Sequence, residues 1–151
     1  QVIAALALTA ALTMTPASGE WHNLPDPIEK GQKIHDDTAS LYKGPGYVAK
    51  DNKRRLCIRF YESRHAYGAK ASEPYRGAYQ FSPAMGVGAG WMVQKSLREQ
   101  GVPKWQAIYI GRILRTEPVN RWGKLYQDHA FWLIWDNGNG RHHWPNTDRG
   151  C

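Results

Sequence analysis

The sequence predicts a mainly helical domain of the α+β class, with one short loop or strand region between its first two core helices. Several segments carry apolar residues at the three- and four-residue spacing that buries one face of a helix. Proline and glycine residues punctuate the chain between these segments. A length of 151 residues suits one domain and hardly two, and no internal repeat is visible.

The first core helix is expected over residues 54–63, where apolar residues recur up to Tyr61. A loop or hairpin is expected over residues 64–82, because glycine and proline punctuate it. Within that loop, residues 78–81 are predicted to form a short extended piece. The charged residues 50–55, just before the helix, are expected to form a solvated face.

Three further helices are predicted after this loop. Residues 83–100 form the second helix, which Gly101 ends at a position where a left-handed cap is common. The third and fourth helices are expected over residues 104–115 and 119–135. Turn residues follow, and the last eleven residues lack periodicity and need an anchor.

The N-terminal residues have the features of a secretory signal peptide. Residues 2–14 are uncharged and rich in Ala and Leu, and residues 15–19 are small or turn-forming. The apolar run is too short to span a bilayer comfortably. We therefore predict a partial signal peptide over residues 1–19, a lead-in segment over 20–53 and the folded domain over 54–151. A buried N-terminal helix and a retained membrane anchor are the alternatives.

The two cysteines, Cys57 and Cys151, are expected to form a disulfide. An even cysteine count in an exported chain is typical of such a bond, and two free thiols are the alternative. The bridge would anchor the C-terminus. Closing so long a loop contributes about 4 kcal/mol in the chain-entropy model.

The net charge of +7 indicates a polyanionic partner. Nucleic acid is one candidate, and the anionic bacterial envelope suits an exported protein better. The seven Trp and eight Tyr provide flat apolar faces with a polar edge. These rings stack on sugars or on bases, so the aromatic content alone does not choose between the two partners.

Glu62 is the sharpest candidate for chemistry. It lies near the C-terminal end of its predicted helix, beside Phe60 and Tyr61. Apolar surroundings and the negative end of the helix dipole both disfavour the carboxylate, so its pKa is expected to be raised. Such an acid can protonate a glycosidic oxygen near neutral pH. Arg59 and Arg64 would oppose the shift at close range, and a lone glutamate at a helix end is commonly solvated or capping.

Four sequence motifs together resemble a known family. The segments are CIRFYES at 57–63, YRGAYQF at 75–81, WGKLYQDHAFW at 122–132 and GRHHW at 140–144. They are similar to the transglycosylase-like domains of actinobacteria and their phages, which are related to resuscitation-promoting factors and belong to the lysozyme-like superfamily. The resemblance covers about residues 54–151.

This resemblance implies a small lysozyme-like domain with a substrate cleft and with Glu62 as catalytic acid. It implies that Gln80 reaches toward the glycan, and that Ser63 lies in the cleft, where its hydroxyl orients the acid or binds substrate. Tyr79 either shapes the cleft or faces the core. The family commonly has glycine where this chain has Arg64, which puts the loop geometry in doubt. The residues expected to bind substrate are Ser63, Glu73, Tyr79 and Gln80.

A second carboxylate is expected in most glycosidases. Glu73 and Asp128 are the candidates, although a surface or N-cap role is the favoured interpretation of both. Lytic transglycosylases of the resembled kind use one glutamate, with assistance from the substrate's N-acetyl group, and form a 1,6-anhydro ring. The absence of a clear second motif leans toward that route, and hydrolysis by water stays open.

No cofactor or metal is expected. His129, His142 and His143 match no strong zinc spacing and are expected to line a cleft or the surface. The residues at 136–140 fail the ligand register of a calcium loop. Residues 86–90 lack the spacing of a dinucleotide fingerprint, and the chain contains no phosphate-binding P-loop.

The sequence therefore predicts a secreted, wall-associated, monomeric enzyme that cuts the β-1,4 bond between N-acetylmuramic acid and N-acetylglucosamine. Its partner is the glycan strand of peptidoglycan, without nucleic acid and without a stable membrane span after signal removal. A non-catalytic wall-binding module is the first alternative. A basic nucleic-acid-binding protein, supported only by charge and aromatic content, is the second.

Overall fold

A computed structural model describes residues 23–29 and 41–151 of the chain. The predicted signal peptide over 1–19 and part of the lead-in segment lie outside these described residues. The α-helices of the described part are α1 (Asn52–Ser63), α2 (Pro83–Glu99), α3 (Lys104–Thr116), α4 (Lys124–Trp135) and α5 (Pro145–Arg149). Its 3-10 helices are η1 (Ala49–Asp51), η2 (Val119–Arg121) and η3 (Asp136–His143).

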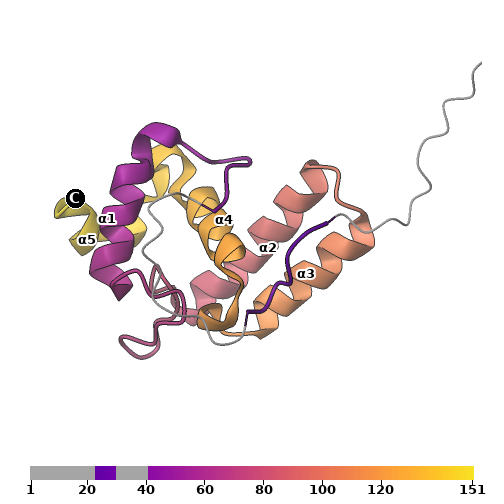
Figure 1. The fold of residues 1–151 in the computed structure, drawn as a ribbon, viewed down its shortest axis with the longest axis horizontal. Helices are drawn as coiled ribbons and strands as arrows, with labels where there is room; N and C mark the ends of the chain where they lie inside the picture. The colour runs from indigo at the N-terminus through magenta and orange to yellow at the C-terminus, as the bar shows by residue number, and fades with distance from the viewer. Residues whose placement is uncertain (1–22, 30–40) are drawn as a thin grey trace, which may run out of the picture.

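The helices are arranged around α4 (Figure 1). In this view α1 and α5 lie on one side of α4, and the paired helices α2 and α3 lie on the other. Nine of the twelve residues of α4 are buried, including three of its polar ones. A helix that is buried on nearly every side is surrounded by other elements of the protein. The helix α4 is accordingly the centre of the fold.

The mainly helical prediction is confirmed, and α2 and α3 lie within one residue of their predicted ends. The predicted helix over 119–135 is instead broken into η2 and α4. Trp122 and Gly123 between them have extended backbone angles. The cause is a close approach by the lead-in segment, because the Gly123 amide donates to the Pro27 carbonyl at 2.8 Å. A Cβ atom at Gly123 would lie 2.9 Å from the carbonyl oxygen of Asp26.

The region between α1 and α2 is a loop that ends in a tight hairpin, as expected. Arg76 and Phe81 exchange two backbone hydrogen bonds, of 3.0 and 2.9 Å. The prediction of an extended piece over 78–81 is wrong, because residues 77–80 form a turn. Gly77 and Gln80 have positive φ angles of 80° and 50°, which reverse the chain direction.

The C-terminal segment is held to α1 by the predicted disulfide, which the structure contains between Cys57 and Cys151. Part of this segment is more regular than expected, since it forms the short helix α5, with Pro145 in its first turn. Asp148 of α5 accepts hydrogen bonds from Arg54 of α1 at 2.6 Å and from Arg141 of η3 at 2.9 Å. The end of the chain is therefore tied to α1 at two places.

The core is unusually aromatic, as the composition suggests. Trp122, Trp132, Trp135 and Trp144 are buried together with Phe131. The rings of Trp132, Trp135, Trp144 and Phe131 pack against one another at centroid distances between 4.9 and 6.5 Å. Within the described part of the chain, no helix has the length and apolar content needed to cross a membrane.

The double variant Cys57→Ser/Cys151→Ser should lower the free energy of unfolding by about 4 kcal/mol, because the bridge closes a loop of 94 residues. Urea unfolding followed by tryptophan fluorescence measures the change. Wild-type protein under reducing conditions is the control and should show a similar loss. A loss below about 1 kcal/mol would show that the ion pairs of Asp148 alone hold the C-terminus.

Candidate functional site

Glu62 lies in the last turn of α1 and is partly buried. Its Oε1 atom accepts a hydrogen bond of 2.9 Å from the Thr147 hydroxyl of α5. Sequence reasoning did not identify Thr147. The available signal was its position four residues before Cys151, in the segment that the disulfide was expected to anchor against the helix of Glu62.

Burial raises the pKa of Glu62, and the hydrogen bond from Thr147 opposes that rise. The direction agrees with the expectation from sequence, although the surroundings differ. Phe60 and Tyr61 are 41% and 54% exposed, so neither ring is packed into the core beside the carboxyl. The guanidinium of Arg64 lies over the Phe60 ring, 4.4 Å from its centroid. The carboxyl is thus held by a neutral donor from α5.

The backbone after Glu62 turns sharply. Arg64 caps α1 in the left-handed region at φ 53°, and His65 follows at φ 67°. Glycine adopts this conformation without a steric penalty, whereas other residues pay roughly 1 kcal/mol. The position where the resembling family commonly has glycine is therefore one where the backbone favours glycine. Arg64 keeps the turn and adds a side chain that packs on Phe60.

Ser63 connects α1 to the hairpin turn. Its hydroxyl lies 2.8 Å from the carbonyl oxygen of Ala78 and 3.1 Å from that of Arg59. Ser63 is buried, and its hydroxyl proton is directed to these two backbone carbonyl acceptors. Ser63 therefore fixes the position of the turn against the end of α1, instead of orienting the Glu62 carboxyl as its sequence position suggested.

The hairpin turn presents Gln80 and buries Tyr79. Tyr79 is 1% exposed, and its hydroxyl donates to Asp128, so this side chain faces the core instead of a ligand. Gln80 is partly buried, and its amide nitrogen donates to the Gly77 carbonyl at 2.8 Å. The Gln80 Oε1 atom is buried and accepts no hydrogen bond from the described residues. The turn thus holds one buried amide acceptor whose hydrogen-bonding capacity is unused within the described part of the chain.

The two candidates for a second carboxylate lie in different surroundings. Glu73 has an exposed side chain that pairs with Arg76 through both carboxylate oxygens, so the surface interpretation fits it. The surface or N-cap interpretation of Asp128 is wrong, because this residue is completely buried in α4. Its carboxylate forms an ion pair with Arg55 at 3.5 Å. The expectation that residues 50–55 are solvated therefore fails at Arg55, which is also completely buried.

Asp128 is the centre of a buried polar network. Its Oδ1 atom accepts hydrogen bonds from the hydroxyls of Tyr67 at 2.8 Å and Tyr79 at 2.5 Å. Arg55 also donates to the Tyr79 hydroxyl at 2.7 Å, and Arg59 donates to the Tyr67 hydroxyl. The network joins α1, the loop after it, the hairpin turn and α4. It is a structural element that positions the helix of Glu62.

The histidines divide into a buried one and an exposed pair. The expectation that His129 lines a cleft or the surface is wrong, since it is completely buried, stacks on Tyr42 and lies 3.0 Å from the Ser96 hydroxyl. Burial lowers the pKa of His129 to about 3, which keeps the ring neutral. His142 and His143 are exposed, as expected. The described residues contain no group of three His, Cys, Asp or Glu that could hold a metal ion.

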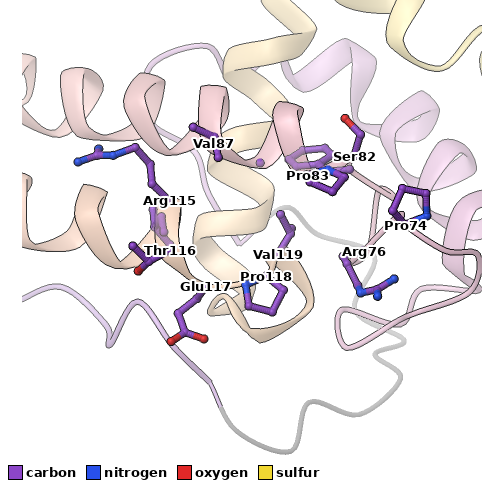
Figure 2. A pocket seen from close by; sticks show the side chains of 13 residues that line it. Pro74, Arg76, Ser82, Pro83, Val87, Arg115, Thr116, Glu117, Pro118 and Val119 are labelled. Carbon is purple, nitrogen blue, oxygen red and sulfur yellow. The ribbon is translucent and has the colours of Figure 1, made fainter.

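A pocket of about 340 Å³ lies between the start of α2, the end of α3 and the hairpin loop (Figure 2). Arg76, Arg115 and Glu117 carry charge around it, and Phe81 and Val119 are among its apolar lining. Glu62 does not belong to this lining. The hairpin connects the two places, because Arg76 and Phe81 line the pocket while Ala78 is bonded to Ser63 beside the acid.

Comparisons with protein-family models, with curated proteins and with solved structures find no match. The candidate site therefore rests on the residue motifs and on the geometry around Glu62.

Thr147→Val should raise the pKa of Glu62 further, because the hydroxyl that donates to the carboxylate is replaced by a methyl group of similar size. NMR titration of the Glu62 side-chain carboxyl measures the change. Thr147→Ser keeps the donor and is the matched control, with an unchanged titration expected. A titration that moves to lower pH in the valine variant would contradict this account of the site.

Asp128→Asn should lower the free energy of unfolding by about 3–5 kcal/mol, because Arg55 would be left as a buried charge without its counterion. Thermal or urea unfolding measures the loss. Glu99→Gln removes an exposed ion pair with Lys95 and should change stability by less than about 1 kcal/mol. Equal stability of the two variants would show that the network does not depend on the Asp128 charge.

Proposed function

We propose that this chain is a peptidoglycan-cleaving enzyme of the lysozyme-like superfamily, with Glu62 as its general acid and base. The observation that carries the proposal is the partly buried Glu62 carboxyl at the end of α1, because burial raises the pKa of this group. The same helix end is bonded to the turn that carries Gln80, through the hydrogen bond from Ser63 to Ala78. The sequence motifs around both residues support the same assignment.

In the proposed reaction, the protonated Glu62 donates its proton to the oxygen that links N-acetylmuramic acid to N-acetylglucosamine. The bond between the muramyl C1 and that oxygen breaks, and the sugar alcohol departs with the transferred proton. The Glu62 carboxylate then takes a proton from the nucleophile that attacks C1. With the muramyl 6-hydroxyl as nucleophile the product is a 1,6-anhydro ring, and with water it is a reducing sugar.

The surroundings of the other carboxylates favour the anhydro route. Asp128 is completely buried behind the tyrosine hydroxyls, and Glu73 is exposed and paired with Arg76. Neither environment suits a nucleophile or base that must touch the sugar opposite Glu62. A mechanism with a single glutamate, in which the substrate supplies the assisting N-acetyl group and the attacking hydroxyl, needs no further carboxylate.

The positive charge and the disulfide support a setting outside the cell. A net charge of +7 attracts the chain to the anionic wall, and a disulfide persists in oxidising compartments. We accordingly propose a secreted, wall-associated monomer whose partner is the glycan strand of peptidoglycan.

Glu62→Gln should reduce the release of soluble fragments from purified, insoluble peptidoglycan by about 10²–10⁴-fold, because the amide cannot donate or accept the transferred proton. Mass spectrometry of the fragments distinguishes anhydro-muramyl ends from reducing ends. Glu73→Gln removes the exposed candidate for a second carboxylate, and the single-glutamate route predicts that it keeps the wild-type rate. Reducing ends together with a slow Glu73→Gln variant would indicate hydrolysis with two carboxylates.

A different result would favour the binding alternative. If the wild-type chain sediments with walls but releases no fragments from them, and Glu62→Gln sediments equally, the domain is a non-catalytic wall-binding module.

A further inference from the structure

The outward face of the α2–α3 pair carries an exposed tryptophan among basic residues. We call it the Trp91 face and define it by Trp91, Gln94, Lys95 and Arg98 of α2 and by Arg112 and Arg115 of α3. Gln94 and Lys95 each lie three or four residues from both Trp91 and Arg98, so the four α2 residues share one side of the helix. Trp91 is 55% exposed, more than any other tryptophan among the described residues.

The Trp91 ring is held in place from α3. The Arg115 guanidinium lies 3.5 Å from the ring centroid, and the same guanidinium donates to Gln94 Oε1 at 2.8 Å. Two glycines permit this close approach, since a Cβ at Gly111 would lie 2.4 Å from Gln94 Oε1 and one at Gly90 would lie 2.7 Å from the Arg115 side chain. The indole is therefore a positioned platform and not a loose surface side chain.

Positive charge exceeds negative charge along these two helices. Between Pro83 and Glu117 the chain has five Lys or Arg and two Glu, a surplus of three of the overall +7. Lys95 pairs with Glu99, whereas Arg98 and Arg112 form no ion pair with the described residues. Burial, and after it the charge of Arg112, lowers the pKa of Arg115. Crowded cations of this kind are relieved when an anion binds between them.

An open hollow beside the indole has room for a sugar unit. It measures about 580 Å³ and is lined by Trp91, Gln94, Lys95, Arg98 and Glu99. Ligand sites in proteins commonly have volumes of about 300–1,000 Å³. The lining combines one flat apolar ring with amide, ammonium and guanidinium donors, which suits a ring that carries hydroxyl and anionic groups.

We propose that the Trp91 face is an accessory binding site for an anionic glycan of the cell wall, in which a sugar ring stacks on Trp91 and its carboxylate or phosphate groups pair with Arg98 and Arg112. The choice of a wall polymer rests on the proposed function. Single-stranded nucleic acid is a poorer fit, because such strands stack successive bases on several rings and this face offers one.

The site is separate from Glu62. The α2–α3 pair lies across α4 from α1 and α5 (Figure 1). Arg115 of the Trp91 face also lines the pocket of Figure 2, and Glu62 does not belong to that lining. An anionic polymer bound there holds the enzyme on the wall without occupying the candidate acid. Loss of the accessory site is therefore expected to weaken retention on walls and to spare bond cleavage in short, soluble fragments.

Co-sedimentation of the full chain with purified walls tests the proposal. Trp91→Ala and the double variant Arg98→Gln/Arg112→Gln should each weaken binding by about tenfold, the effect of losing one aromatic or charged anchor. Lys43→Gln/Lys50→Gln, at two exposed lysines outside this face, removes the same charge and is the matched control. Its binding should stay within about twofold of wild type, and circular dichroism checks that every variant is folded.

Two further comparisons separate this site from the proposed function and from nucleic acid. Glu62→Gln should sediment with walls like wild type. A variant that loses cleavage but keeps Trp91-dependent binding would therefore bear on the role of Glu62 and not on the accessory site. Walls stripped of their anionic polymers should bind wild type and Trp91→Ala equally. The proposal would be overturned if both face variants bound walls as well as wild type does, or if the lysine control lost as much wall binding as they do. It would also be overturned if the face variants lost binding only to a single-stranded DNA probe.

Discussion

The buried carboxylate of Asp128 is the group on which the arrangement of this domain depends. It forms an ion pair with Arg55 of α1. It also accepts hydrogen bonds from the Tyr67 hydroxyl of the loop after α1 and from the Tyr79 hydroxyl of the hairpin turn. Its Oδ2 atom accepts a hydrogen bond of 2.9 Å from the Leu41 backbone amide, so the lead-in segment contacts the same carboxylate. An uncompensated buried charge costs several kcal/mol, and each of these elements is consequently fixed relative to α4.

The position of Glu62 follows from two such ties. From the core side, Ser63 and Gln127 hold the hairpin turn, since Ala78 accepts from the Ser63 hydroxyl and donates to Gln127 Oε1 at 2.8 Å. From the outer side, the disulfide and the ion pair of Asp148 with Arg54 hold α5 against α1. This contact places the Thr147 hydroxyl within hydrogen-bonding distance of the Glu62 carboxyl. The candidate acid is therefore positioned by contacts that are distant in sequence, although its own motif is short.

Local signals predicted much of the fold and contacts across the chain decided the rest. Pro83, Gly101 and Pro118 delimit α2 and α3, so those helices were predictable from residue types and spacing. The break before α4 was not, because its cause is the Gly123 contact with Asp26 and Pro27, almost a hundred residues earlier. The burial of Arg55 was missed for a related reason. A charged residue is exposed by default, and its partner lies 73 positions away in a helix that gives no sign of the pairing.

The surroundings of Glu62 and Asp128 differ in ways that matter for the proposed acid catalysis. Asp128 is enclosed by a cation and two hydroxyl donors, and it has no surface for a substrate to reach. Glu62 is bonded to a neutral hydroxyl and is partly exposed, while burial raises its pKa. Under the proposed function, the two carboxylates therefore take opposite roles through their surroundings. The charge fixed in the core holds the helices in place, and the helix end that they position carries the group able to gain and lose a proton.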